Sequence, residues 1–336
     1  MIRCLFGSFV IRLQISISME KYAAKIDCSM EQWIPPFLKS GDKIGVAATA
    51  RWITPAQLER ARSLFSAQGW ELVVAENVFE QDYQLAGNDY RRAQGLQGML
   101  DDPDIRAIII ARGGYGTVRV IDQLDFSKWK NHPSWICGYS DITVLLSHLV
   151  KMGYASIHSS MPVSFDDCTE AALTTLCEAL NGDLKKVAFT TSVESSVEVS
   201  GRLVGGNLSV LYSLLGSVSY PRLEETILFI EDVDEMIYHI DRMMMGLARA
   251  GVLAGVKAIL VGGLTQMKDN TKSFGFQVDN PFGGDALDMI RRVGESMNIP
   301  VISGFPAGHQ SDNRAFYIGR NATITALNGS AVMSWS

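Results

Sequence analysis

A serine at the junction of a predicted strand and a predicted helix is the first candidate for chemistry. Ser140 follows the apolar run Trp135–Tyr139 and precedes the amphipathic run Ile142–Met152. A serine at such a turn is lifted above the carboxyl edge of a sheet, where the N–H of the next residue, Asp141, can stabilise an oxyanion. The second glycine of the G-x-S-x-G pattern is missing, because Ile142 stands there. The spacing fits a nucleophile, but it also fits a helix N-cap, the commonest role of a serine before a helix.

A glycine-rich loop directly follows another predicted strand, Ile105–Ile110. The loop reads Ala111-Arg112-Gly113-Gly114-Tyr115-Gly116. Loops at the carboxyl ends of strands bind ligands in open α/β sheets, and glycines there let a backbone N–H approach a reacting atom. The lysine of a Walker phosphate loop is absent, and G-x-G-x-x-G is not met. The loop therefore fits backbone contacts to a ligand, and an ordinary tight turn is the open alternative.

A nucleophilic serine needs a general base, and the five histidines of the chain are the candidates. His309 lies in a loop between two predicted strands, a good position for a side chain that serves a pocket. His148 lies in the middle of a predicted helix and is interpreted as structural, and His132 lies in a polar loop. His158 and His239 stand near the ends of predicted elements. His309 is the favoured base on position alone.

The acid of a triad has several candidates at one place in the chain. The predicted strand 226–230 is followed by a cluster of carboxylates: Glu231, Asp232, Asp234 and Glu235. A charged, solvated strand end has the same pattern, and paired carboxylates also bind Mg²⁺ or Ca²⁺. Spacing alone does not choose among these side chains or among these roles.

These residues are positioned by a chain in which short apolar runs alternate with amphipathic runs from Lys43 onward. Up to about Pro162, strand and helix alternate, which predicts a parallel sheet with crossover helices. The polar stretch Thr190–Ser200 precedes a second half of mixed α and β elements, whose last run contains a hairpin signal, Asn328-Gly329. Strands are predicted at 43–48, 70–75, 105–110, 135–139, 226–230, 258–261, 300–302 and 315–318. Helices are predicted at 54–68, 88–101, 117–124, 142–152, 170–180, 207–215, 240–250 and 285–296.

The change of pattern predicts an N-terminal domain over residues 34–180, a linker over 181–200 and a C-terminal domain over 201–336. Residues 1–33 are predicted to be an extension, or the product of a start assigned too early. The first 18 residues resemble a weak signal peptide, but Arg12 interrupts their apolar run and no small-x-small cleavage site follows. We therefore expect a cytoplasmic protein, with export as the alternative if those 18 residues act as a signal.

Composition argues against several classes of function. The 336 residues carry a formal net charge of −6 and no Lys/Arg-rich run, so neither nucleic acid nor an anionic membrane is an expected partner. The five cysteines form no C-x-x-C pair, which favours neither a disulfide framework nor a zinc site and fits a reducing compartment. No uninterrupted apolar run reaches the roughly 18 residues of a membrane span.

Several motifs in order resemble the LD-carboxypeptidase family of serine peptidases, which includes muramoyltetrapeptide carboxypeptidases and microcin-C immunity peptidases. The resemblance covers roughly residues 34 to 330. Its motifs are Pro35–Gly45, Leu85–Asp89, Ala111–Gly116, Gly138–Asp141, Gly205–Leu208, Phe229–Asp232 and Gly304–His309. Two segments depart from the family pattern: His158–Pro162 stands where His-Gly-Pro-Met is frequent, and Ala48–Arg51 replaces a more usual Ala-Pro-Ser stretch. Both departures concern the substrate more than the chemistry.

The resemblance implies a role for each candidate residue. Ser140 is the nucleophile, His309 the general base, and Glu231 the acid that orients the histidine. Backbone N–H groups of Asp141 and of the Gly113-Gly114 turn, Gly114 in particular, form the oxyanion hole. Substrate contacts are implied for three residues: Arg112, Gly113 and Asn207. Asn207 is alternatively a plain helix N-cap.

The resemblance also implies a fold and an activity. The fold is α/β, a flavodoxin-like N-terminal domain with a parallel sheet joined to a smaller, β-rich α/β C-terminal domain, usually as a homodimer without metal or cofactor. The activity is hydrolysis of an L,D-peptide bond through an acyl-enzyme, which releases terminal D-alanine from murein tetrapeptide in peptidoglycan recycling. The alternatives are a microcin-C-type immunity peptidase that cleaves peptidyl-nucleotides and a non-catalytic peptide-binding homologue.

Overall fold

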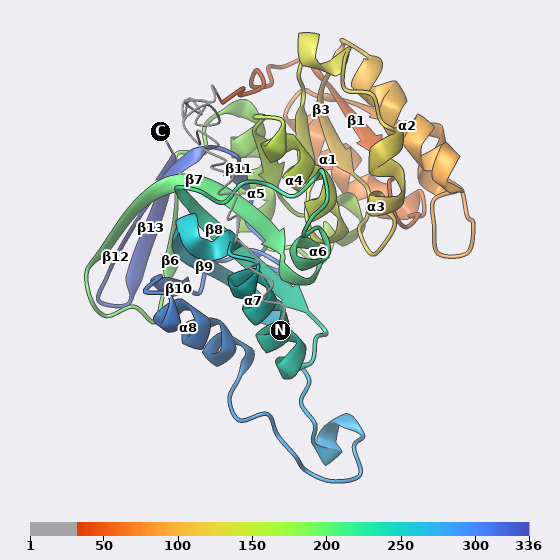
Figure 1. Cartoon of the computed structure of the whole chain (residues 1–336). Helices are drawn as coiled ribbons and strands as arrows, with labels where there is room; N and C mark the ends of the chain where they lie inside the picture. Colours follow the sequence, from red (N-terminus) through yellow and green to blue (C-terminus); the bar gives the residue numbers. More distant parts are fainter. Residues whose placement is uncertain (1–31, 336) are drawn as a thin grey trace, which may run out of the picture. The chain divides into compact units, whose positions relative to one another are not determined.

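The computed structural model describes residues 32–335, which form two β-sheets with helices packed against them (Figure 1). The predicted extension, residues 1–33, lies almost wholly outside the described residues. The first sheet has the strand order β11-β5-β4-β3-β1-β2, in which β1 to β5 are parallel and β11 is antiparallel to β5. Its strands are β1 (Lys43–Ala47), β2 (Glu71–Val74), β3 (Ile105–Ile110), β4 (Trp135–Gly138), β5 (Ser156–His158) and β11 (Phe316–Ile318).

The second sheet has the order β10-β9-β8-β7-β12-β13-β6. The strands from β10 to β7 are parallel, and the pairs from β7 onward are antiparallel. Its strands are β6 (Lys186–Thr190), β7 (Val197–Asn207), β8 (Thr226–Val233), β9 (Val256–Thr265), β10 (Val301–Ser303), β12 (Asn321–Leu327) and β13 (Ser330–Trp335). Each sheet therefore has a parallel part, and the loops at the carboxyl ends of those strands are available for a site.

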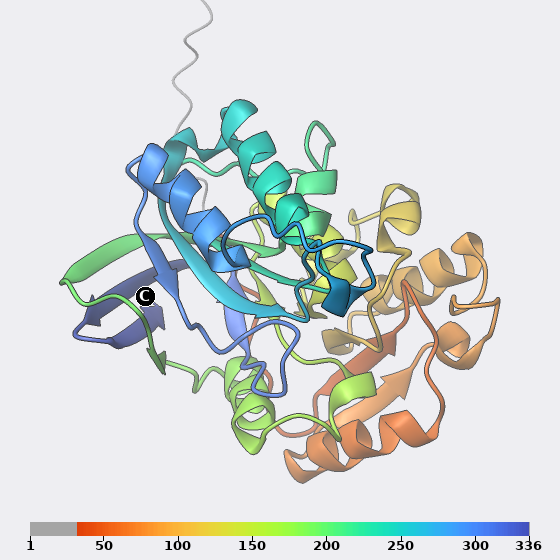
Figure 2. The ribbon, with the colours of Figure 1, turned by 90° about the horizontal axis from the view of Figure 1, so that it is seen from below.

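The helices divide between the two sheets. Those of the first half are α1 (Glu59–Ala67), α2 (Asp89–Asp101), α3 (Thr117–Val120), α4 (Thr143–Lys151) and α5 (Glu170–Asn181). Those of the second half are α6 (Leu208–Ser213), α7 (Ile237–Arg249) and α8 (Ala286–Ser296). Helices α7 and α8 lie side by side against the second sheet (Figure 2). None of the helices among residues 32–335 is long and apolar enough to cross a membrane.

Strong local signals explain why these elements form where they do. The run Ile105–Ile110 is buried along nearly its whole length, as a central parallel strand covered on both faces must be. Helix α8 begins with a capping box in which Asp285 and Asp288 each accept the other's backbone N–H. Asn328 and Gly329 have φ angles of 49° and 77°, the left-handed values of a tight hairpin turn, and they join β12 to β13. The predicted hairpin is confirmed.

The predicted α/β fold with a parallel first sheet is confirmed, but two expectations differ from the structure. The strand at 315–318 is expected in the second half, whereas β11 pairs with β5 in the first sheet. The range predicted as a linker, 181–200, contains β6 and the beginning of β7. In β6 and at the beginning of β7 exposed residues alternate with more buried ones, so no apolar run marks these strands, and antiparallel partners stabilise them. The domain boundaries themselves stay a prediction.

Candidate active site

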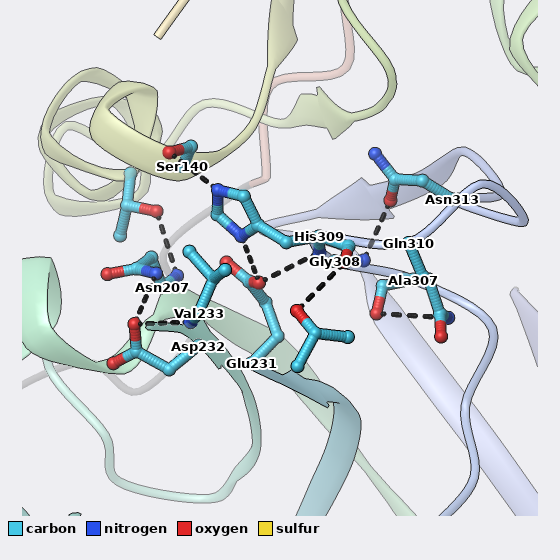
Figure 3. A network of polar contacts seen from close by, with 12 residues as sticks. Ser140, Asn207, Glu231, Asp232, Val233, Ala307, Gly308, His309, Gln310 and Asn313 are labelled. Atoms are coloured by element: carbon cyan, nitrogen blue, oxygen red, sulfur yellow. Dashed lines mark hydrogen bonds and ion pairs between the residues drawn. The ribbon is translucent and has the colours of Figure 1, made fainter. Parts of the chain in front are cut away.

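Ser140 lies at the carboxyl end of β4, in a 3₁₀ turn (Ser140–Ile142) that leads into α4. Its φ is +64°, a left-handed value that few non-glycine residues adopt and that a sharp strand-to-helix elbow requires. The N-cap position of the turn is held by Tyr139, and Ser140 makes no capping hydrogen bond within the described residues. The N-cap interpretation of Ser140 is therefore wrong, because the left-handed backbone directs its side chain toward His309 (Figure 3).

The structure brings Ser140, His309 and Glu231 into one hydrogen-bonded chain. Ser140 Oγ lies 3.0 Å from His309 Nε2, and His309 Nδ1 lies 2.7 Å from Glu231 Oε2. The backbone N–H of His309 donates to the same carboxylate oxygen at 3.2 Å. Since a carboxylate only accepts, Nδ1 carries the imidazole proton and Nε2 accepts from the serine hydroxyl. The arrangement can therefore deprotonate Ser140.

Burial and charge act in opposite directions on His309. Burial lowers the pKa of its imidazole, while the hydrogen bond and negative charge of Glu231, with a further contribution from Asp232, raise it. The net effect is a pKa above the ordinary value, so the protonated imidazole is favoured more than in a free histidine. The centroid of the Tyr139 ring lies 4.9 Å from that of the His309 imidazole. Burial raises the pKa of the Tyr139 phenol to about 12, so the phenol stays neutral.

The glycine loop after β3 lies directly against the serine. A Cβ atom on Gly113 would stand 3.2 Å from Ser140 Cβ and 3.4 Å from Ser140 Oγ. The buried carboxylate of Asp141 accepts the backbone N–H of Thr117 at 2.9 Å, which ties the end of this loop to the serine turn. The first N–H groups of a helical turn have no partner within it, as applies to Asp141. Gly113 thus lies directly against Ser140, and the oxyanion role of the Asp141 and Gly114 N–H groups stays a prediction.

Strand β8 extends to Val233, beyond the predicted end at 230, so Glu231 and Asp232 lie on it and Asp234 and Glu235 follow it. Of the four carboxylates, Glu231 is the one that contacts His309. Asp232 accepts from Asn207 Nδ2 and from the N–H of Ser209. Asp234 forms an ion pair with Lys268, and Glu235 Oε2 lies at hydrogen-bond distance, 2.8 Å, from His239 Nδ1. Within residues 32–335, no group of three or more His, Cys, Asp and Glu side chains is arranged to hold a metal ion.

Asn207 and Arg112, the other two implied substrate contacts, have protein partners. Asn207 Oδ1 accepts the N–H of Val210 at 3.1 Å, so the helix-cap interpretation is confirmed. Its backbone N–H donates to Thr143 Oγ1, which links β7 to α4. Arg112 is half-buried, and its Nη1 donates to the carbonyl of Trp52 at 3.4 Å. A contact of either side chain with substrate stays a prediction.

Asn313 fixes the loop that carries His309, and no sequence pattern predicts this role. Its Oδ1 accepts the N–H of Gly308 at 2.8 Å and that of His158 Nε2 at 3.2 Å. Gly308 directly precedes His309, whose own carbonyl accepts from Thr265 Oγ1 at 2.9 Å. Burial lowers the pKa of His158 to about 4, so its imidazole is a neutral donor here. An asparagine in a polar loop has no sequence signal that would identify it as this clamp.

Replacing Asn313 should loosen the loop that holds the base. Asn313→Ala leaves two buried N–H donors without their acceptor, which is expected to lower the free energy of unfolding by about 1–3 kcal/mol. Urea denaturation followed by far-UV circular dichroism measures this loss. Asn280→Ala, in an exposed loop, is the control and should change stability by less than about 0.5 kcal/mol. Equal stabilities for the two variants would contradict the clamp.

A cavity of about 460 Å³ opens beside the imidazole. This volume is within the range of small-molecule sites. Its lining residues are Tyr139, Ser160, Ser164, Asp167, Cys168, Val233, Gln266, His309, Gln310 and Ser311. Of the three residues of the hydrogen-bonded chain, His309 lines this cavity, and Tyr139 lines it next to Ser140 in the sequence.

Comparison with known proteins places both halves of the chain. The family model described as the LD-carboxypeptidase N-terminal domain matches residues 44–159, and that of the LD-carboxypeptidase C-terminal domain matches residues 200–324. A probable murein peptide carboxypeptidase of Bacillus subtilis is 31% identical over 313 residues, which cover 89% of this chain and 93% of the relative.

Solved structures share the fold over nearly the same span. The crystal structure of muramoyltetrapeptide carboxypeptidase from Oxalobacter formigenes has a TM-score of 0.78 at 27% identity, covering 88% of this chain and 98% of that one. The microcin C7 self immunity protein MccF, in complex with aspartyl sulfamoyl adenosine, has a TM-score of 0.78 at 22% identity, covering 90% and 98%. At 22% identity, the similarity to MccF is evidence of a shared fold alone.

Proposed function

Because the chain belongs to the LD-carboxypeptidase family, we propose that it is a serine carboxypeptidase that releases the terminal D-alanine of a murein tetrapeptide. Its class as a peptidase follows from the family. The observation that carries the serine mechanism is the hydrogen-bonded chain from Ser140 through His309 to Glu231, at 3.0 and 2.7 Å. Nucleophile, base and orienting acid stand in the order that acyl transfer requires.

The proposed reaction proceeds in two halves. His309 Nε2 takes the hydroxyl proton of Ser140 while Oγ attacks the carbonyl carbon of the L,D-peptide bond. The N–H groups of Asp141 and Gly114 stabilise the resulting oxyanion, each contributing about 10²–10³ in rate. His309 then protonates the departing amine, and a water molecule hydrolyses the acyl-enzyme by the same proton transfers in reverse. Throughout, Glu231 stabilises the imidazolium and holds its orientation.

The choice of substrate is supported by the relatives that are named for murein peptides, at 31% and 27% identity. The alternative, cleavage of a peptidyl-nucleotide, has the support of fold similarity alone, because MccF is 22% identical. The proposal includes two further properties taken from the family resemblance: a role in peptidoglycan recycling in the cytoplasm, and a homodimeric state.

The direct test is incubation of the protein with purified murein tetrapeptide and chromatographic assay of free D-alanine. Release of D-alanine and tripeptide in equal amounts is the expected result. A peptidyl sulfamoyl nucleotide is assayed in parallel. Cleavage of the nucleotide without release of D-alanine would replace the murein assignment by the immunity-type one, and cleavage of neither would favour the non-catalytic peptide-binding alternative.

The pH dependence of the reaction should report on His309. The base acts as neutral imidazole, so kcat/KM falls as the pH drops through the pKa of His309 in the free enzyme. Because Glu231 raises this pKa above 6.5, activity should already be half lost at a pH above 6.5. A pH profile of kcat/KM in constant ionic strength checks this. An acid limb centred below 6.5 would contradict the electrostatic influence of Glu231 on the base.

A further inference from the structure

Two arginines beside the glycine loop lack the carboxylate partners that partly buried arginines normally have. Arg51 lies after β1, and Arg112 lies after β3, so both stand at the carboxyl edge of the first sheet. Within residues 32–335, neither forms an ion pair. Arg51 Nε is buried and has no hydrogen-bond acceptor in the part of the chain that the structure describes. An orphaned buried donor of this kind requires an explanation.

The position of Arg51 relative to the nucleophile follows from two consecutive glycines. Gly113 borders Ser140, because a Cβ atom added to this glycine would stand 3.4 Å from Oγ. At Gly114, whose φ is +113°, a Cβ atom would stand 2.6 Å from Arg51 Nε and 2.7 Å from Arg51 Cδ. Adjacent Cα atoms lie about 3.8 Å apart. The side chain of Arg51 therefore packs against Gly114, one residue further along the loop from Gly113, which borders Ser140.

The positive charge of Arg51 also acts on Arg112. Burial, followed by the positive charge of Arg51, lowers the pKa of Arg112. Like charges in a partly desolvated place repel, and an anion bound to both removes the repulsion and supplies the missing acceptors. The planar fork of arginine matches the two oxygens of a carboxylate. The local charge and geometry thus call for a small anion next to the oxyanion loop.

We propose that Arg51 and Arg112 bind the C-terminal carboxylate of the peptide substrate and thereby restrict cleavage to the last residue. The inference rests on the proposed function for the position of the scissile bond. In a peptide, the terminal carboxylate carbon follows the scissile carbonyl carbon by one residue. This spacing matches the step from Gly113, which borders Ser140, to Gly114, which borders Arg51. Arg51 stands in one of the segments that depart from the family pattern.

The test compares murein tetrapeptide with its C-terminal amide, which differs only in lacking the terminal charge. The unmodified enzyme is expected to prefer the acid by about 10- to 100-fold in kcat/KM, the effect of hydrogen bonds to a charged group. Arg51→Gln should lower kcat/KM for the acid by a similar factor, through KM, and leave the amide unaffected. Arg51→Lys should retain part of the preference, and Arg112→Gln should lose it. Arg60→Gln, which removes a surface ion pair with Glu170, is the control that should keep the full preference.

Calorimetric binding to Ser140→Ala separates this proposal from the proposed function. Tighter binding of acid than of amide, lost in Ser140→Ala/Arg51→Gln, supports the carboxylate site even if the unmodified protein releases no D-alanine. Equal hydrolysis and equal binding of acid and amide would overturn the arginine site and leave the carboxypeptidase intact.

Discussion

Ser140→Ala is expected to abolish release of D-alanine, with a fall in kcat on the order of 10⁶-fold, as in enzymes whose serine, histidine and acid act as one unit. The variant keeps the imidazole and the carboxylate but removes the proposed nucleophile, Ser140 Oγ, which lies 3.0 Å from His309 Nε2. Because the triad acts as a unit, adding His309→Ala should cost little more. Initial rates with excess tetrapeptide measure both variants.

The control for Ser140→Ala is Ser296→Ala. Ser296 is the last residue of α8, and its Oγ donates to the carbonyl of Val293 at 2.8 Å. Within the described part of the chain, it makes no hydrogen bond to His309. This variant should turn over tetrapeptide at the rate of the unmodified enzyme. Circular dichroism checks that Ser140→Ala folds. Undiminished release of D-alanine by folded Ser140→Ala would show that another group attacks the peptide bond.

Glu231→Gln is expected to lower kcat by about 10³- to 10⁴-fold, the second largest effect. The change preserves the shape of a fully buried side chain but removes its charge. In the proposed mechanism, the imidazolium of His309 then lacks the anion that lies 2.7 Å from its Nδ1. The loss should fall on kcat more than on KM, because the charge acts in the transition state. Steady-state kinetics over a range of tetrapeptide concentrations separates the two parameters.

A second histidine–glutamate pair in the same segment provides the matched control for Glu231→Gln. Glu235 lies four residues further along, and its Oε2 is 2.8 Å from His239 Nδ1. Glu235→Gln makes the same chemical change to a similar pair that has no serine at the other imidazole nitrogen among the described residues. It should leave kcat unchanged. Equal losses in the two variants would indicate that general electrostatics at the end of β8, rather than support of His309, is responsible.

The elements that carry the site are predictable because their signals are local. The apolar run of β3 is predicted to the residue, and helix α2 within one, since burial and capping act over neighbouring positions. Ser140 is identifiable by its place between a strand and a helix. Whether Ser140 is a helix cap or a candidate nucleophile cannot be inferred from its neighbours in sequence, because the answer depends on contact with His309, 169 residues away.

The pairing of β11 with β5 is not predictable from the apolar pattern. A strand of three residues is too short for its apolar pattern to identify a partner strand. After β10 the chain leaves the second sheet, forms β11 at the edge of the first sheet and returns to the second sheet as β12. This crossing carries the 304–315 loop, with His309 and Asn313, to the edge where Ser140 stands. The clamp made by Asn313 depends on the same crossing, since His158 lies on β5.

The order of residues along the chain is enough to place a serine after β4, glycines after β3, a cluster of carboxylates at the end of β8 and a histidine in a loop. Which of these carboxylates contacts the histidine follows from the packing of the folded chain. Glu231 and Asp232 are neighbours on β8, beside an irregularity in its pairing with β9, and their side chains have different partners. Glu231 faces the loop of His309, and Asp232 faces the start of α6. The face that meets His309 is set by packing between distant segments, which no local pattern encodes.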